Sequence, residues 1–176
     1  MMERIKSKEE LIKNLAEELD MSNTESWPFV DLTDQTVGMR FDSSIGDPSL
    51  DEDLDGHELV DIEPISSREG YEMMEDFART RNDDECDKIF RAISGHKPFR
   101  SFRVCVETLG ILNDWYTFKN AAMLKKAEEI LSDYDLDFID GKIVCNNPKN
   151  VLTFIYERPN FEDEEDEDNE DNDEEE

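Results

Sequence analysis

Apolar positions recur at helical spacing in the first twenty residues and again from about residue 66 to residue 134. Lys8–Asp20 carries one apolar stripe, and Ser7 with Glu10 has the pattern of an N-terminal capping box. A second box, Ser66 with Glu69, opens a run of four predicted helices. They begin after Ser66, after Asn82, at Pro98 and near Asn113, and the last continues to about Tyr134.

Strand-like alternation occupies the regions between and after these helices. Phe29–Leu32 and Val37–Phe41 flank a polar turn, which predicts a hairpin. His57–Ile65 alternates apolar and acidic residues and predicts a third strand. A second hairpin is predicted over Lys142–Glu157, with its turn at Asn146–Asn150.

These elements predict an α+β fold, a small antiparallel sheet packed with a layer of four helices. We divide the chain into an N-terminal amphipathic helix (1–21), a single α+β domain (22–161) and a disordered acidic tail (162–176). Thirteen of the last fifteen residues are carboxylates, and blocks of like charge are typically solvated. The apolar stripe of the first helix either packs on the body or contacts a partner, and packing is the favoured alternative.

Three segments of the helical part resemble a bacterial group catalogued as uncharacterised protein family 158. They are YEMMEDFA (Tyr71–Ala78), AISGHKPFRSFRVCVETLG (Ala92–Gly110) and WYTFKNAAMLKKAEEIL (Trp115–Leu131). The matching residues are basic or aromatic: Phe99, Arg100, Phe102, Arg103, Trp115 and Phe118. The N-terminal helix, the C-terminal hairpin and the tail lie outside this resemblance, which implies one compact α+β domain and no particular activity.

The charge of the chain excludes some classes of partner. It has 48 Asp and Glu against 19 Lys and Arg, a formal net charge of −29. This argues against a general nucleic-acid binder and against docking on anionic membranes. An odd set of three cysteines without a CxxC pair indicates reduced thiols. With no apolar secretory segment and no membrane-length apolar run, we expect a cytoplasmic protein without membrane contact.

One acidic string has the start of a calcium-binding loop. Asp51–Gly56 supplies oxygen ligands at positions 1, 3 and 5 and glycine at position 6 of an EF-hand pattern. Position 12, which needs a bidentate Glu, is Ile62, and Pro48 stands where the entering helix should be. We therefore expect a solvated acidic loop and no metal site.

The basic residues concentrate in one stretch, Lys88–Val106, which contains no carboxylate. We select Arg91, Lys97, Arg100 and Arg103 as a candidate anion- or partner-binding set. Lys97 and Arg100 fall near the start of the helix opened by Pro98, where free backbone amides favour anions. Two alternatives remain open: salt bridges to nearby carboxylates, which are favoured, and docking of the chain's own acidic tail.

Catalytic patterns are missing from the sequence. His57 and His96 belong to no recognised nucleophile, zinc or phosphate-binding motif. Cys105 lies between two valines of a predicted helix and is typical of a small buried hydrophobe. The helical spacing typical of buried core residues is also found in four aromatic residues: Phe99, Phe102, Trp115 and Phe118. We predict a non-enzymatic protein without a cofactor.

The acidic surface gives the preferred functional hypothesis. Asp51, Asp53 and Asp55 share a loop, and Asp61 and Glu63 are two apart on one predicted strand, about 6.6 Å from each other. Such an array attracts basic proteins and loosely resembles backbone phosphates. The sequence thus predicts an interaction module that binds a basic protein partner. Mimicry of nucleic acid by the acidic surface is one form of this hypothesis. The alternative is an anion- or nucleic-acid-binding protein that uses Lys97–Arg103; the oligomeric state stays open.

Overall fold

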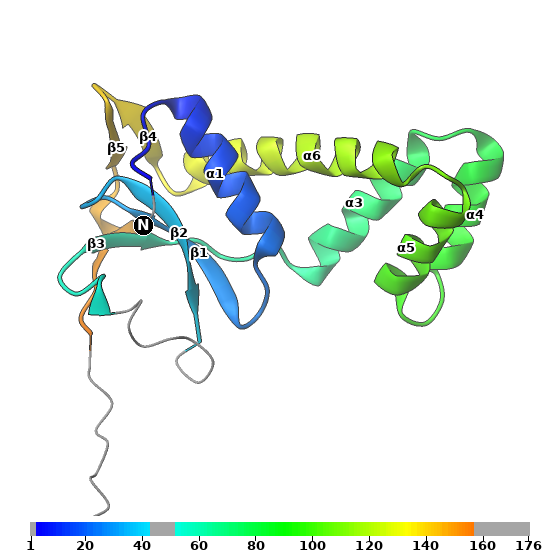
Figure 1. The fold of residues 1–176 in the computed structure, drawn as a ribbon, viewed down its shortest axis with the longest axis horizontal. Helices are drawn as coiled ribbons and strands as arrows, with labels where there is room; N and C mark the ends of the chain where they lie inside the picture. Colours follow the sequence, from blue (N-terminus) through cyan, green and yellow to red (C-terminus); the bar gives the residue numbers. More distant parts are fainter. Residues whose placement is uncertain (1–2, 43–51, 157–176) are drawn as a thin grey trace, which may run out of the picture.

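The computed structural model describes residues 3–42 and 52–156, which form two lobes that share one long helix (Figure 1). The shared helix, α6 (Leu112–Asp133), has 22 residues and is therefore about 33 Å long. Its first half packs in the helical lobe with the three helices between residues 67 and 108, and its second half packs in the sheet lobe with the N-terminal helix and the strands. The predicted α+β class, with a small antiparallel sheet beside helices, is confirmed.

The sheet has the strand order β2-β1-β3-β6, and all neighbours are antiparallel. The strands are β1 (Ser26–Asp31), β2 (Thr36–Phe41), β3 (Glu58–Asp61) and β6 (Leu152–Thr153). The first predicted hairpin is confirmed. The third strand is also present, but it is shorter than the predicted range His57–Ile65. In the register, Val30 faces Val60 and Phe29 faces Asp61, so alternate residues point to opposite faces.

One face of this sheet packs against α1 (Lys8–Met21). Leu11, Leu15 and Leu19 are buried there with Val30 and Val60, so the helix buries its apolar stripe in the sheet lobe. The Oγ of Ser7 accepts a hydrogen bond from the Glu10 amide, as the capping pattern predicts. The Glu10 carboxylate, however, accepts from the amide of Lys6 and not from that of Ser7, so the predicted box is only half formed.

The predicted C-terminal hairpin is wrong in its pairing. β5 (Lys142–Cys145) pairs with β4 (Leu136–Ile139), a strand missing from the prediction, and β6 pairs with β3. The two residues between β4 and β5, Asp140 and Gly141, have φ values of 51° and 78°. Positive φ at both central positions is the conformation of the two-residue turns that Asp-Gly favours in hairpins. The expected turn segment contains instead a short 3₁₀ helix, η1 (Pro148–Asn150).

The helical lobe contains α3 (Ser67–Arg79), α4 (Asp83–Ile93) and α5 (Pro98–Thr108). Ser66 and Glu69 form the predicted reciprocal capping box, and the Asn82 side chain caps α4 through the Glu85 amide. The core of this lobe is an aromatic cluster around Phe77, which is 1% exposed. Within the part of the chain that the structure describes, no helix is long and apolar enough to cross a membrane. The predicted tail, 162–176, lies outside the described residues.

The contacts of Glu69 predict that the stability of the fold decreases in acid. Its carboxylate is bonded to the Nζ of Lys126 at 2.6 Å and to Ser66, and these contacts lower its pKa to about 2. A depressed carboxylate pKa stabilises the fold above the ordinary pKa of 4.5, and this contribution is lost as the pH falls towards 2. Glu69→Gln should therefore lower the free energy of unfolding by about 1 kcal/mol at pH 7. The difference from wild type should shrink between pH 5 and pH 2.

Urea unfolding of both proteins across this pH range measures the effect. Glu72→Gln is the matched control, because Glu72 makes an exposed ion pair with Arg68 in the same helix and takes no part in the cap. A Glu69→Gln difference that stays constant with pH would contradict the assignment.

Candidate functional site

A buried carboxylate organises a cluster of titratable side chains at one end of the sheet. Asp31, the last residue of β1, is 1% exposed. Its Oδ1 accepts hydrogen bonds from the amides of Thr33 and Asp34, at 2.8 and 3.0 Å, which shape the turn into β2. Its Oδ2 lies 2.7 Å from Nδ1 of His57. The orientation of the carboxylate is therefore set from both sides.

His57 reaches Asp31 from the residue just before β3. Because β1 and β3 are neighbours and Asp31 faces Leu59, His57 lies on the same face of the sheet, one alternate position away. The His57 side chain is 19% exposed. The hydrogen bond to Asp31 raises its pKa against the opposing effect of burial, and the charges of Asp34 and Asp53 add to the increase.

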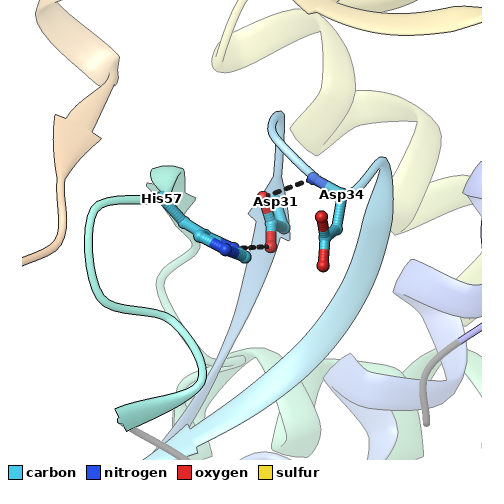
Figure 2. Close-up of side chains that lie close together, drawn as sticks. All are labelled: Asp31, Asp34 and His57. Atoms are coloured by element: carbon cyan, nitrogen blue, oxygen red, sulfur yellow. Dashed lines mark hydrogen bonds and ion pairs between the residues drawn. The ribbon is translucent and has the colours of Figure 1, made fainter.

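Asp34 completes the cluster from the β1–β2 turn. One ligand atom from each of Asp31, Asp34 and His57 lies within 4.8 Å of the other two, and Figure 2 shows the three side chains side by side. Asp34 is exposed, and its carboxylate makes no hydrogen bond or ion pair with another described residue. An imidazole nitrogen with two carboxylates is a donor set for a transition-metal ion, and sequence reasoning missed it.

The predicted basic residues divide into paired and unpaired sets. Arg103 is bonded to Glu107 at 2.7 Å in the same helix, as a structural salt bridge requires. Arg91, Lys97 and Arg100 are exposed and form no ion pair within residues 3–42 and 52–156. Lys97 has a positive φ of 57° and is the N-terminal cap residue of α5 without a side-chain capping bond. The three unpaired cations thus surround the α4–α5 junction.

The predicted acidic residues do not form one array. Asp61 makes two bonds of 3.1 and 3.2 Å to the guanidinium of Arg40, which also stacks 4.3 Å above the ring of Phe154. β3 ends at Asp61, so Glu63 lies beyond the strand, exposed next to Pro64.

Residues 52–56 pack through the buried Leu54 against the face of the sheet that carries Asp61. Asp55 accepts a hydrogen bond from the amide of Tyr156, and Asp53 is exposed near His57. Asp51, the first position of the calcium-like string, lies outside the described residues.

A cleft of about 740 Å³ lies where the two lobes meet. We call it the interlobe cleft; its apolar lining includes Met73, Met74, Phe99, Phe102, Trp115 and Met123. Phe99 was predicted in the buried stripe of its helix but is 47% exposed. It belongs to the first turn of α5, where its ring lies against Gly70 and lines the cleft. Arg103 and Lys119 also line the cleft.

A second hollow, the α1–α6 groove, has a volume of about 700 Å³. Four apolar and four polar side chains line it: Ala16, Met21, Met123 and Leu124, and Lys13, Glu17, Asp20 and Asn120. Asp20 and Met123 also line the interlobe cleft, so the two hollows adjoin. Met21 is 63% exposed and Leu124 is 41% exposed, which leaves an uncovered apolar surface beside the cleft.

Comparison with known proteins identifies the family of this chain. The profile described as "Uncharacterised protein family (UPF0158)" matches residues 8–157. The matched range includes α1 and the β4–β5 hairpin, so the expectation that the N-terminal helix and the C-terminal strands lie outside the family is wrong.

A curated relative, the UPF0158 protein PA5073 of Pseudomonas aeruginosa, is 30% identical over 94 residues. That alignment covers 51% of this chain and 61% of the relative. No solved structure matches the chain. With most of the chain matched by the family profile, this protein belongs to the uncharacterised protein family UPF0158.

Proposed function

We propose that this protein is a non-enzymatic, cytoplasmic interaction module that binds a segment of a basic partner protein in the interlobe cleft. The observation that carries the proposal is the adjacency of the cleft and the α1–α6 groove, two hollows of several hundred cubic ångströms with largely apolar linings. Binding sites are concave, mostly apolar and frequently located between structural units. In this protein the cleft and the groove lie where α1 and the helical lobe contact α6.

The composition of the lining favours a peptide segment as the ligand. Met73, Met74 and Met123 supply flexible, polarisable side chains, which adapt to different apolar partners. Phe99 is an exposed part of the cleft lining, and the exposed Met21 and Leu124 extend this apolar surface into the adjoining groove. A peptide with spaced apolar side chains fits such an elongated shape.

The charge of the protein favours a basic partner. Glu17 and Asp20 in the α1–α6 groove are already paired with Lys13 and Lys119. The negative charge beside the cleft comes instead from the exposed Glu63, which precedes Pro64 at the cleft wall. The chain as a whole has a net charge of −29, which attracts cations over long range. A segment with apolar anchors flanked by Lys or Arg combines both forms of complementarity.

Fluorescence of Trp115 tests the proposal directly. The chain has two tryptophans, so in a Trp27→Phe variant the emission reports on the cleft alone. We would titrate this variant with a 16-residue Leu/Lys amphipathic peptide, a Leu/Glu peptide of the same pattern and a Ser/Lys peptide. We expect a saturable change with the Leu/Lys peptide only, and about a tenfold weaker Kd when Phe99→Ser removes an apolar anchor.

Ile155→Ser is the matched control, because Ile155 is 72% exposed and does not line either hollow. It should leave the Kd unchanged. Equal binding of the Ser/Lys peptide would show that the interaction is non-specific charge attraction. It would contradict the proposal that the peptide binds in the interlobe cleft. Binding of the Leu/Glu peptide would favour the second candidate.

The second candidate function is anion binding at the α4–α5 junction. It is favoured by the unpaired state, among the described residues, of Arg91, Lys97 and Arg100 in a protein rich in carboxylates. A single-stranded oligonucleotide at low salt is the probe. If an Arg100→Ala and Arg103→Ala double variant stays folded and binds the oligonucleotide as the wild type does, this candidate fails.

A further inference from the structure

We propose that Asp31, Asp34 and His57 bind a divalent first-row transition-metal ion of the Zn²⁺ type. The three residues come from the end of β1, the β1–β2 turn and the start of β3, and their ligand atoms lie within 4.8 Å of one another. This site lies on the sheet lobe and shares no residue with the interlobe cleft or the α1–α6 groove. The metal-site proposal can therefore be tested independently of the proposed function.

The donor chemistry selects the class of ion. An imidazole nitrogen beside carboxylate oxygens suits Zn²⁺ and its first-row neighbours, whereas Ca²⁺ and Mg²⁺ prefer sites made only of oxygen. His57 thus separates this site from the calcium loop that the sequence of residues 51–56 superficially resembles. The carboxylate of Asp53 from that segment lies close enough to act electrostatically on His57, so the site has an excess of negative charge.

The site is partly organised before any ion binds. Asp31 keeps one oxygen on the amides of Thr33 and Asp34 and directs the other at Nδ1 of His57. Such outer bonds fix the orientation of a ligating carboxylate. The 2.7 Å between Asp31 Oδ2 and His57 Nδ1 is the length of a hydrogen bond in which Nδ1–H donates to the carboxylate. An ion bound to Nδ1 takes the place of this proton: a neutral ring carries it on Nε2 instead, and a protonated ring releases one proton to solvent.

Asp34 supplies the adjustable third ligand. Metal–ligand bonds of about 2.0–2.2 Å in a tetrahedral site place two ligand atoms about 3.3–3.6 Å apart. An ion therefore needs Asp31 Oδ2 and His57 Nδ1 to separate from their present 2.7 Å, and the Asp34 carboxylate to close on both. Asp34 is exposed and has no competing side-chain bond within the described residues, so its carboxylate rotates at little cost (Figure 2).

NMR spectroscopy of the histidine rings tests the site in the full-length protein. The chain has two histidines, so His96 on the other lobe is an internal control for His57. We would titrate ZnCl₂ into ¹⁵N-labelled protein in a buffer with excess CaCl₂, which occupies the oxygen-only sites of the acidic chain. We expect the ring nitrogens of His57 to shift and saturate at one equivalent of Zn²⁺, while those of His96 stay unchanged.

Two variants decide between a built site and adventitious binding. Asp34→Asn removes the third ligand without breaking a described side-chain bond, and it should weaken Zn²⁺ binding at least tenfold by calorimetry. Glu63→Gln, an exposed carboxylate outside the cluster, should leave the affinity unchanged. Unchanged His57 resonances, or equal affinities for wild type and Asp34→Asn, would overturn the proposal and leave Asp31 and His57 as a purely structural pair.

Discussion

Replacing Phe77 by alanine is expected to lower the free energy of unfolding by about 3–5 kcal/mol. The Phe77 ring lies at the centre of the helical lobe, 5.4 Å from the ring centroids of Trp115 and Phe118 and 6.2 Å from that of Phe102. It joins α3 to both α5 and α6. Alanine would leave a cavity between three helices that no neighbour can fill without moving a whole element.

Chemical denaturation followed by circular dichroism measures this loss, and Phe99→Ala is the matched control. Phe99 is an identical side chain in the same lobe, but it is 47% exposed. Its removal should cost about 1 kcal/mol or less, since it buries much less area. Similar losses for the two variants would mean that the aromatic cluster is not the core of the helical lobe.

The helices of that lobe were predictable from sequence because their signals are local. Ser66 with Glu69, and Asn82 before α4, satisfy amide groups within one turn, and no distant contact is needed to recognise them. Phe99 shows the limit of such patterns. Its spacing places it on the apolar stripe of α5, but burial depends on what covers that turn of the helix, and here an open cleft lies beside it.

Strand pairing was predicted less well because it depends on distant partners. Lys142–Glu157 contains two strand-like runs, and their nearness in sequence suggested a hairpin. The turn chemistry of Asp140 and Gly141 is a stronger signal than the longer polar segment at Asn146–Asn150, and it directs β5 back onto β4. Nothing local shows that β6 pairs with β3, almost a hundred residues earlier in the chain.

The same reasoning explains which candidate residues were found. Arg91, Lys97 and Arg100 stand out as cations in a stretch without carboxylates, so composition alone selects them. Asp31 and His57 are 26 residues apart and meet only because β1 pairs with β3. Once that pairing is known, the alternation of side chains along the strands places Asp31 and His57 on one face of the sheet. The usable signal was an aspartate at the end of an otherwise apolar strand.

Gln35→Met is expected to lower the free energy of unfolding by about 2–4 kcal/mol, because it leaves buried polar groups without partners. Gln35 is 7% exposed, and its side-chain amide bridges the β1–β2 turn to the β4–β5 hairpin. Oε1 accepts from the amide of Ile143, and Nε2 donates to the carbonyls of Leu32 and Ile143. Methionine has a similar volume but makes none of these bonds.

Gln35→Gly separates this loss from backbone strain, since Gln35 has a positive φ of 62° that glycine adopts freely. We expect the glycine variant to be destabilised by less than the methionine variant but to remain below wild type. Hydrogen exchange at the Ile143 amide gives the local readout, and it should accelerate in both variants. A glycine variant as stable as wild type would mean that the bridge only offsets the strain of its own turn, and that the two sheets are joined by apolar contacts alone.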